Sequence, residues 1–399
     1  MLIGYKFNNF FSFNIESELY LEAPVGKVKS RFPDNFTSTD AGYDLLKTAV
    51  IVGENAGGKS NFIGSLKFLK SLFDVNMKVQ SVGPFVNASS LLTEKNPKQC
   101  FETCFITSIG VVYRYTLSID MNGIVEEGLF LQNKRKSAFT EIFSVKRDND
   151  GRFVKKGGKT KELTVALKNS NNSYGLFVTK LALLGNKDAA NTVDWFVNVL
   201  LPGTVPIDQE NNPAQKDEDI RVMKDPRFIE IFRMVDYSIC GIEVDVDKPY
   251  GKTVVIRKDS DGNQIRRELG QDSTGVREFF AWAVQIFRTV YEGRVVFADE
   301  MDRVLNPILS DRVIAFINGM EHRGQFVFST HNVLHLNLKT YMKEQIYFVT
   351  KSPESLTSEL YSLADFTEVR YETSKIYEFY MKGILGGTAF EYNGPAPHC

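Results

Sequence analysis

The 399-residue chain contains few of the residues on which disulfide-rich and zinc-binding proteins depend. Its four cysteines are too few and too far apart for a disulfide framework. Cys100 and Cys104 are spaced to share one face of a strand, but no second pair of ligands lies near them, so a zinc site is not expected. We therefore interpret the thiols as structural.

The chain also lacks long apolar runs and a large net charge. No stretch approaches the roughly 18–20 apolar residues of a bilayer-spanning helix. The opening "MLIGYKFNNFFSF" lacks the charged segment and long apolar core of a signal peptide. With 48 Lys and Arg against 49 Asp and Glu, the formal net charge of −1 gives no overall positive field to attract nucleic acid or membrane. These absences predict a cytoplasmic protein with no membrane partner.

What the sequence does contain is a regular alternation of strand and helix patterns near both ends of the chain. The short apolar runs "TAVIVG", "RVVFADE" and "GQFVFSTH" are typical of buried strands, and amphipathic helical segments separate them. This alternation predicts an α/β fold with a mostly parallel sheet. Because the first run is far in sequence from the other two, we expect a split core made of residues 1–75 and 240–399.

The segment between the two halves of the core changes pattern twice. Residues 76–160 alternate apolar and polar residues around the turn signals "DMNG" and "DNDG", which predicts an antiparallel β subdomain. Residues 161–239 are predicted to form an inserted helical lobe, with "SYGLFVTKLALLG" and "TVDWFVNVLLPG" as its best amphipathic segments. Another hairpin is predicted in "KTVVIRKDSDGNQIRREL".

The stretch "GENAGGKS" follows the first apolar run and contains G-x-x-x-x-G-K-S, the pattern that cradles phosphate. Gly53 and Gly58 let the backbone wrap closely enough for its N–H groups to face phosphate oxygens. Lys59 is predicted to reach the β- and γ-phosphates, and the Ser60 hydroxyl to ligate Mg²⁺. The match lies between a strand and a helix, as this chemistry requires. The other residues predicted to contact the nucleotide are Asn55, Ala56, Gly57 and Asn61.

Two acidic residues follow another apolar strand. In "RVVFADE", Asp299 and Glu300 lie at the carboxyl end of the strand, where open α/β sheets bind ligands. Asp299 is predicted to hold Mg²⁺, and Glu300 to polarise the attacking water as a general base. Taken alone the pair is an ordinary solvated strand end, but beside a P-loop it indicates ATP hydrolysis.

Two further sites depend on their place in this order. His331 ends the strand "QFVFSTH" and is predicted to contact the γ-phosphate, whereas His335 is interpreted as structural. "DSTG" places Ser273 and Gly275 at the start of a helix, where a hydroxyl and free N–H groups form an anion site. Taken alone, the stretch is equally well an ordinary N-cap made by Asp272 or Ser273.

The order of these motifs resembles the ABC-type ATPase head of SMC, RecF-type and OLD-type proteins. The resemblance implies that residues 1–75 and 240–399 form the nucleotide-binding core. It also implies that the signature Ser273 and Gly275 of one copy cap the γ-phosphate held by a second copy, in a head-to-head dimer or higher homo-oligomer. "DSTG" departs from the usual leucine-Ser-Gly-Gly signature. Asp302 falls at the D-loop, and the Q-loop glutamine has two candidates, Gln80 and Gln99.

A finer resemblance is to the AAA-type, OLD-related ATPases, through "FNNFFSF", "GENAGGKSNF", "DSTG" and "YETSKIYEFYMKGILGGT". That group includes abortive-infection ATPases and the ATPase subunit of the phage anti-restriction-induced system. The resemblance implies ATP and Mg²⁺ as cofactors, a separately encoded toxin or nuclease effector, and a phage-derived trigger protein.

We do not expect the chain to be a nuclease itself. Too few residues follow the last predicted helix for a TOPRIM fold of roughly a hundred residues. The acidic pair Asp245 and Asp247 alternates with valines like the exposed face of a strand, so we interpret it as structural.

One local surplus of charge leaves a second function open. Between Lys134 and Lys161 there are ten Lys or Arg residues against three acidic ones. Such a segment is able to follow a phosphate backbone or attract an acidic partner, although a solvated hairpin explains it equally well. The alternative function is therefore an SMC- or RecF-like DNA-repair ATPase that acts directly on duplex DNA.

Overall fold

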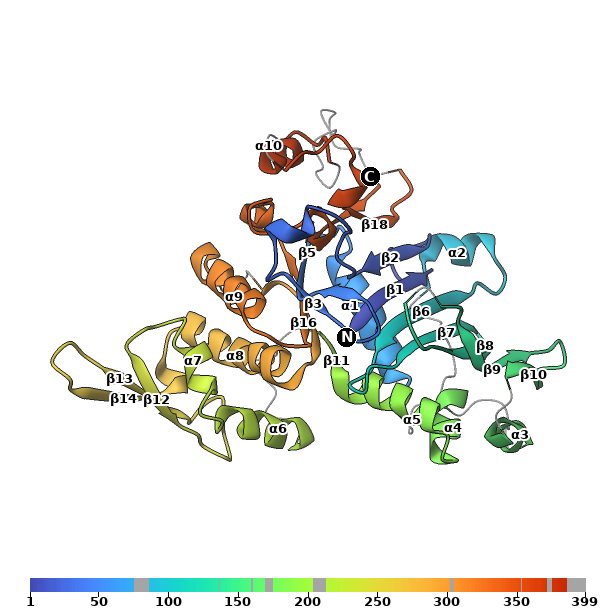
Figure 1. Ribbon diagram of the computed structural model, residues 1–399, viewed down its shortest axis with the longest axis horizontal. Coiled ribbons are helices and arrows are strands. Elements are labelled where there is room, and N and C mark those ends of the chain that lie inside the picture. The colour runs from blue at the N-terminus through green and yellow to red at the C-terminus, as the bar shows by residue number, and fades with distance from the viewer. Residues whose placement is uncertain are drawn as a thin grey trace.

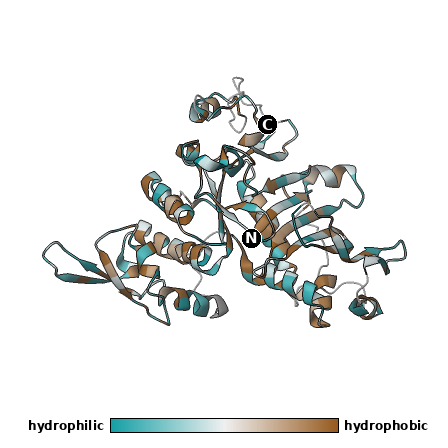
Figure 2. Ribbon diagram, in the orientation of Figure 1, coloured by the Kyte–Doolittle hydropathy of each residue, from teal (hydrophilic) through white to brown (hydrophobic). Residues whose placement is uncertain are grey.

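The computed structural model describes most of the chain and contains two large sheets that meet at the centre of the molecule (Figure 1). The described residues are 1–74, 86–135, 137–158, 161–168, 175–203, 213–301, 305–352, 354–371 and 375–385. Within them no helix combines the length and the apolarity needed to cross a membrane. Figure 2 shows apolar residues concentrated where the sheets meet, while the hairpin at the far left is hydrophilic.

The central sheet has six strands in the order β11-β15-β16-β5-β17-β18. The first five run parallel, and β18 adds antiparallel to β17. All residues of β5, β15 and β16 are buried, as expected for parallel strands covered on both faces. The strands are β5 (Thr48–Gly53), β11 (Leu200–Gly203), β15 (Val295–Ala298), β16 (Gln325–Thr330), β17 (Ile346–Lys351) and β18 (Ser358–Ser362).

Successive residues of the central strands pack into two different hydrophobic cores, because side chains alternate between the faces of a sheet. Ile51 and Phe297 join the core beneath α1 (Lys59–Ser71) and the second sheet. Their neighbours along the strands belong to the core built on α8 (Thr274–Glu292) and α9 (Pro307–Gly319). The parallel sheet is thus the middle layer of the molecule.

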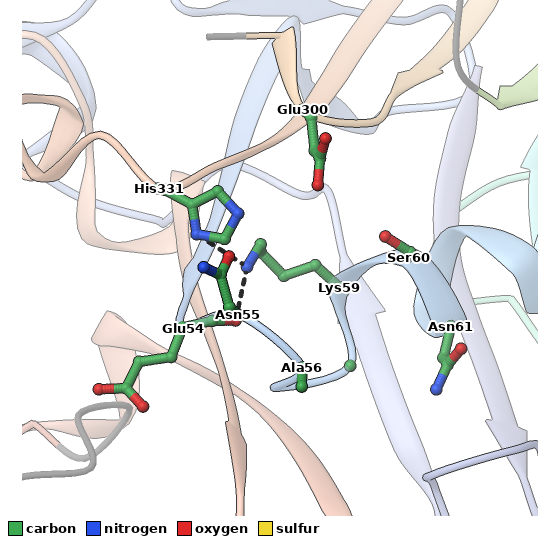
Figure 3. A pocket seen from close by; sticks show the side chains of 9 residues that line it. Glu54, Asn55, Ala56, Lys59, Ser60, Asn61, Glu300 and His331 are labelled. Atoms are coloured by element: carbon green, nitrogen blue, oxygen red, sulfur yellow. Dashed lines mark hydrogen bonds between the residues drawn. The ribbon is translucent and has the colours of Figure 1, made fainter. Parts of the chain in front are cut away.

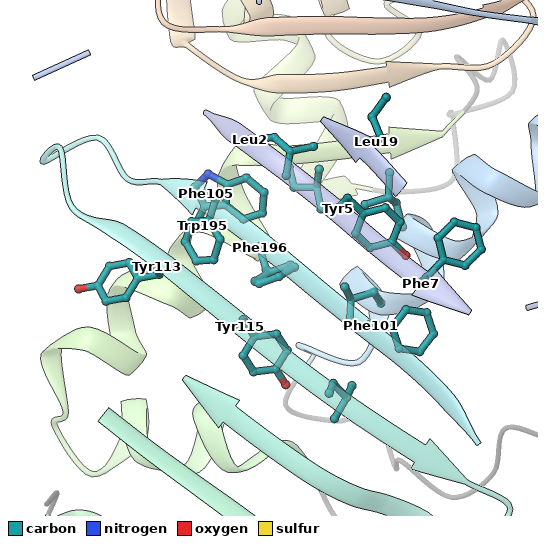
Figure 4. Close-up of a cluster of buried hydrophobic side chains, with 14 of the residues drawn as sticks. Leu2, Tyr5, Phe7, Leu19, Phe101, Phe105, Tyr113, Tyr115, Trp195 and Phe196 are labelled. Carbon is teal, nitrogen blue, oxygen red and sulfur yellow. The ribbon is translucent and has the colours of Figure 1, made fainter. Parts of the chain in front are cut away.

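The second sheet is antiparallel, with seven strands in the order β10-β9-β8-β7-β6-β1-β2. Its inner face carries a dense aromatic cluster (Figure 4), in which the ring of Phe105 stacks on that of Trp195 with centroids 4.2 Å apart. The turns "DMNG" and "DNDG" join β7 to β8 and β9 to β10, which confirms the two predicted hairpins. The strands are β1 (Leu2–Asn8), β2 (Ser17–Tyr20), β6 (Gln99–Ile106), β7 (Val112–Asp120), β8 (Gly123–Gln132), β9 (Thr140–Arg147) and β10 (Phe153–Gly158).

Strand pairing departs from the division predicted by sequence at two places. β1 pairs with β2 and β6, so the first strands extend the antiparallel sheet, whereas the sequence pattern predicts them in the nucleotide-binding core. The predicted helix "TVDWFVNVLLPG" is helical only as far as Val199, after which β11 leaves the helical lobe and pairs with β15 in the central sheet. The sequence pattern thus identified β1 as a strand without its partner, and it missed the change from helix to strand at Leu200.

The remaining elements lie around the two sheets. The predicted hairpin near residue 260 is confirmed as β13 and β14, which pair with β12 in a three-stranded sheet at the edge of the molecule. The other strands are β3 (Phe36–Ser38), β4 (Asp44–Leu46), β12 (Ile239–Glu243), β13 (Val254–Lys258) and β14 (Gln264–Glu268). The other helices are α2 (Ala88–Thr93), α3 (Lys161–Lys168), α4 (Phe177–Leu183), α5 (Lys187–Asp194), a π-helix (Trp195–Val199), α6 (Pro213–Met223), α7 (Phe228–Phe232) and α10 (Ile376–Met381). Short 3₁₀ turns span Lys29–Arg31, Leu269–Gln271, Val333–His335, Lys343–Gln345 and Leu363–Asp365.

Buried side-chain hydrogen bonds fasten the two sheets together. The fully buried amide of Gln325, the first residue of β16, donates to the carbonyls of Leu2 and Leu46, each at 3.0 Å, and accepts from the N–H of Leu2. The hydroxyl of Tyr347 in β17 likewise bonds to both the N–H and the carbonyl of Tyr20. These contacts satisfy backbone groups at the sheet junction that would otherwise be buried without partners.

His322, between α9 and β16, makes the stability of this fold dependent on pH. Its Nδ1 accepts from the N–H of Gly324 at 3.0 Å and its Nε2 lies 2.7 Å from the carbonyl of Ile317, which fits only the neutral ring. Burial lowers the pKa of His322 from 6.5 to about 4. Because the folded pKa is the lower one, its contribution is complete above pH 6.5 and is lost as the pH falls toward 4.

We expect His322→Gln to remove this pH dependence, since a neutral amide satisfies the same two backbone groups without titrating. Between pH 7 and pH 4.5 the unmodified protein should lose about 2.5 kcal/mol more unfolding free energy than the variant. Urea unfolding of both proteins at the two pH values measures this difference. An equal loss in both proteins would contradict the assignment to His322.

Candidate functional site

The glycine-rich loop between β5 and α1 is shaped by contacts that exclude other side chains. A Cβ atom on Gly53 would lie 2.3 Å from the carbonyl oxygen of Val349 in the neighbouring strand. Gly58, which precedes the first residue of α1, has φ of 120°, and a Cβ there would lie 2.5 Å from the hydroxyl of Ser358. Both glycines are therefore required by close packing, and the loop keeps its backbone open toward the start of the helix.

A pocket of about 120 Å³ lies over this loop and brings together residues from three strands of the central sheet (Figure 3). Glu300 lies two residues after the end of β15, and His331 directly follows β16. The residues that line the pocket are Glu54, Asn55, Ala56, Gly58, Lys59, Ser60, Asn61, Glu300 and His331. Eight of these nine are residues that the sequence predicts for the site; the exception is Glu54, which lies within the motif but has no predicted contact.

The ammonium group of Lys59 lies at the centre of the site. Its Nζ donates to the carbonyls of Gly53 at 2.7 Å and Glu54 at 2.8 Å, and lies 3.3 Å from Nδ1 of His331. Because an ammonium group only donates hydrogen bonds, Nδ1 of His331 is the acceptor in this contact. Lys59 is 5% exposed, so its charge is held beside the loop rather than extended into solvent.

The acidic pair is fixed by a third residue on the adjacent strand. The hydroxyl of Ser329 lies 2.6 Å from Oδ1 of Asp299 and 2.8 Å from the N–H of Glu300. Glu300 has φ of 52°, in the left-handed region, and lines the pocket, whereas Asp299 is not part of the lining. The two carboxylates thus differ in position although they are adjacent in sequence.

The predicted Mg²⁺ ligands offer the oxygen donors that this ion prefers. Ser60 is exposed and lines the pocket, and Asp299 is half-buried after the end of β15. Among the described residues no three His, Cys, Asp or Glu side chains cluster closely enough to hold a metal ion by themselves. One hydroxyl and one carboxylate fit an ion that completes its octahedral shell with phosphate oxygens and water.

The predicted signature residues lie outside this pocket. Ser273 caps α8, its hydroxyl accepting from the N–H of Val276 at 3.4 Å, and its side chain is exposed. A Cβ on Gly275 would meet no atom within 4 Å, so this stretch of α8 faces open space. Asp272, just before the cap, is held by two hydrogen bonds from Arg257 of β13, at 3.0 and 3.1 Å. The N-cap alternative is therefore correct locally, and a role across two copies remains a prediction.

Several other predicted residues have different outcomes. Asp302 and Gln80 lie outside the described residues. Gln99 is fully buried in β6 and donates to the carbonyl of Asn9, so it is not a pocket residue. His335 is buried against the rings of Phe328 and Tyr341, in keeping with the structural interpretation. Gly57 forms the loop turn, donating its N–H to the carbonyl of Glu54.

The acidic pair before β13 is placed differently from its prediction. β12 ends at Glu243, so Asp245 and Asp247 lie in the following turn and not on the face of a strand. The carboxylate of Asp245 accepts from the N–H groups of Asp247 and Lys248. This local bonding is typical of a turn-stabilising aspartate.

Sequence motifs missed three serines that support the site. Ser358 of β18 donates to the carbonyl of Gly57 at 2.6 Å, and Ser12 accepts from the side chain of Asn61 at 2.8 Å. Ser329 holds the acidic pair as described above. The only signal for Ser329 was its position two residues before His331, and the other two had none, because they reach the loop from distant parts of the chain.

Comparison with known proteins gives one family match and several remote structural likenesses. The family model described as "AAA domain, putative AbiEii toxin, Type IV TA system" matches residues 49–337, well over half of the chain. No curated protein matches. The matched residues include the glycine-rich loop, Ser273, both acidic residues and His331.

Among solved structures, the SMC head domain from Thermotoga maritima shares 15% identity, with a TM-score of 0.40 over 90% of this chain and 98% of that one. The Smc head domain with an extended coiled coil bound to the C-terminal domain of ScpA, from Pyrococcus furiosus, shares 13% identity, with a TM-score of 0.47 over 96% and 98%. The SmcHead bound to the C-winged helix domain of ScpA shares 14% identity, with a TM-score of 0.47 over 90% and 97%.

Two glycines of the same segment allow a matched test of the loop. Gly58→Ala should weaken ATP binding at least about tenfold, because the new methyl group meets Ser358 and alanine rarely adopts the required φ. Gly64→Ala, in the middle of α1, should leave affinity unchanged and raise stability by about 0.5–1 kcal/mol, since its Cβ has only an ordinary contact with Phe10 at 3.8 Å. Titration with a fluorescent ATP analogue and urea unfolding measure the two effects. Normal ATP affinity in Gly58→Ala would show that the loop does not hold the phosphates.

Proposed function

The chain belongs to the AAA-domain family whose model it matches, a family of P-loop ATPases, and we propose that it binds ATP between two copies of itself to control a separate effector protein. The observation that carries the proposal is the pocket in which Lys59, Glu300 and His331 meet while Ser273 lies exposed elsewhere. The first three residues supply the chemistry of hydrolysis within one copy. Ser273 is exposed and therefore accessible to a second copy of the chain.

Within one copy the side chains have distinct tasks. Lys59 neutralises charge on the β- and γ-phosphates, and the N–H groups of the loop surround them at the start of α1. Glu300 orients and polarises the attacking water, because its carboxylate lines the pocket at the end of β15. Mg²⁺, when bound by Ser60 and Asp299, supplies charge stabilisation to the transferred phosphoryl group.

His331 is suited to report whether the γ-phosphate is present. It lies at the pocket and contacts the ammonium group of Lys59, with Nδ1 accepting. A γ-phosphate that draws Lys59 toward itself would break this contact and leave His331 to bond the phosphate instead. The same two residues would then hold different partners before and after hydrolysis, which is what a nucleotide-controlled switch requires.

The second copy would complete the site through Ser273 and Gly275. The helix that they begin, α8, spans 19 residues and presents its N-terminus without a covering side chain at Gly275. A helix N-terminus with a serine hydroxyl is an effective donor set for a phosphate. Closure would need contacts that ATP offers and ADP lacks, so hydrolysis would separate the copies again.

The output of this cycle is proposed to be regulatory. The description of the matched family, "AAA domain, putative AbiEii toxin, Type IV TA system", names a toxin system, and the sequence resembles ATPases of abortive infection. We propose that a phage-derived trigger changes the nucleotide state of the pair, which then releases or activates a separately encoded toxin or nuclease. The chain's own contribution is ATP hydrolysis in the cytoplasm.

Direct action on DNA is the less favoured function. The basic segment that suggested it is partly neutralised: Arg135, Arg147 and Lys156 form ion pairs with Glu22, Asp120 and Glu126. A surface meant for phosphate backbones would keep such cations available. Stimulation of ATP hydrolysis by duplex DNA, abolished by reversing the charges of Lys134, Lys146 and Lys155, would favour this alternative.

Mixing two inactive variants tests whether the site is shared. Lys59→Ala loses nucleotide binding in its own pocket, and Ser273→Arg blocks its own signature, yet a mixed pair contains one pocket with both groups intact. Because random pairing makes about half of the pairs mixed, each with one intact site of two, we expect the equimolar mixture to regain about a quarter of the wild-type rate of phosphate release at equal total protein.

Each variant alone should be folded and inactive, which circular dichroism and single-variant assays establish. Absence of any rescue, with both variants able to enter mixed pairs, would overturn the shared site. Full activity of Ser273→Arg by itself would do the same.

A further inference from the structure

The hydroxyl of Ser329 occupies a buried position between the two acidic residues that the proposed reaction needs. Ser329 is the fifth residue of β16 and is 0% exposed. Its Oγ lies 2.6 Å from Oδ1 of Asp299 and 2.8 Å from the backbone nitrogen of Glu300. One small side chain on the neighbouring strand therefore contacts both members of the pair.

The direction of both hydrogen bonds follows from the chemistry of the groups. An ionised carboxylate only accepts, and a backbone N–H only donates, so the Ser329 proton points to Asp299 while its lone pair faces Glu300. A hydroxyl is able to do both at once. An apolar side chain makes neither hydrogen bond, and a cysteine thiol makes both only weakly, so neither replaces the serine hydroxyl.

The bond to Glu300 coincides with a strained backbone. Glu300 has φ of 52°, a conformation that residues other than glycine rarely adopt and that persists only when the surroundings impose it. β15 ends at Ala298, which pairs with Phe328, so the regular ladder stops just before the acidic pair. The Ser329 hydroxyl then accepts the N–H that no strand partner receives.

We infer that Ser329 is a positioning residue that sets the two carboxylates to their separate tasks, an inference that rests on the proposed ATPase function. By holding Oδ1 of Asp299 it fixes the orientation of the carboxylate that would ligate Mg²⁺. By holding the N–H of Glu300 it keeps the left-handed turn that directs the Glu300 side chain into the pocket. Ser329 is not among the residues that line the pocket, so it acts through these two residues.

The same strand continues into the pocket, which gives the arrangement a further consequence. Two residues after Ser329, His331 contacts Lys59, so β16 carries both the support of the acidic pair and the contact to the phosphate-binding lysine. A shift of this strand end would therefore alter the position of the general base and of His331 together.

Three substitutions separate the hydroxyl from the volume of the side chain. Ser329→Thr keeps the hydroxyl and adds a methyl group. Ser329→Val has nearly the shape of the threonine variant without the hydroxyl, and Ser329→Ala removes only the hydroxyl. We expect Thr to retain turnover within about threefold, and Val and Ala to lower kcat about 10–100-fold with little change in KM. Phosphate release measures both constants.

Metal binding supplies a readout that does not depend on turnover. Electron paramagnetic resonance measures the affinity for Mn²⁺ in the presence of ADP. This affinity should fall about tenfold in the Ser329→Val and Ser329→Ala variants and stay near wild type in Ser329→Thr. ADP affinity without metal should be equal in all four proteins, since the glycine-rich loop is untouched. Thermal unfolding identifies any variant that is not folded, and the Ala variant, which adds no volume, then carries the comparison.

A kcat near wild type in both Ser329→Ala and Ser329→Val would overturn the inference, because the hydroxyl would then have no specific role. Unchanged Mn²⁺ affinity in Val and Ala would overturn it as well. Failure of the proposed function is distinguishable: Glu300→Gln would then hydrolyse ATP like the unmodified protein, whatever the Ser329 variants do. The Mn²⁺ measurement needs only one copy of the chain, so it is also independent of pairing between copies.

Discussion

The parallel register of three adjacent strands is the constraint on which the rest of the molecule depends. Thr330 pairs with Val52, and Ala298 pairs with Phe328, so β5, β16 and β15 end at the same edge of the sheet. The glycine-rich loop precedes the acidic pair and His331 by more than two hundred residues of sequence, yet each of the three follows one of these strand ends. A slip of one residue in either pairing would turn the alternating side chains to the wrong core and separate the residues that line the pocket.

This register is maintained by burial on both faces. The central strands contribute alternate side chains to two hydrophobic cores, and Gln325 and Tyr347 fasten the antiparallel sheet to the strands that carry the site. The signature end of α8 is held in a different way, by the Arg257 bonds to Asp272 at the edge of the three-stranded sheet. The pocket and Ser273 are thus supported by separate parts of one chain, an arrangement that suits a site completed by another copy.

Local patterns predicted the strands, helices and hairpins of the core, because apolar runs, turn residues and the G-x-x-x-x-G-K-S motif carry their chemistry in a few adjacent residues. They did not predict partners. The alternation in "LIGYKFN" indicates a strand but does not say that it pairs with β6, and the four residues of β11 are too short to distinguish from the end of a helix. Ser12, Ser329 and Ser358 were missed for the same reason: a serine acquires its role only from the distant groups that folding brings to it.

The central claim, that ATP is held between two copies, is tested most directly by the mass of a variant that binds ATP without hydrolysing it. Glu300→Gln should keep the loop and Lys59 intact while removing the general base. Light scattering should report a doubling of mass when ATP and Mg²⁺ are added, and no change with ADP. A mass that stays the same when ATP saturates the pocket would contradict the account.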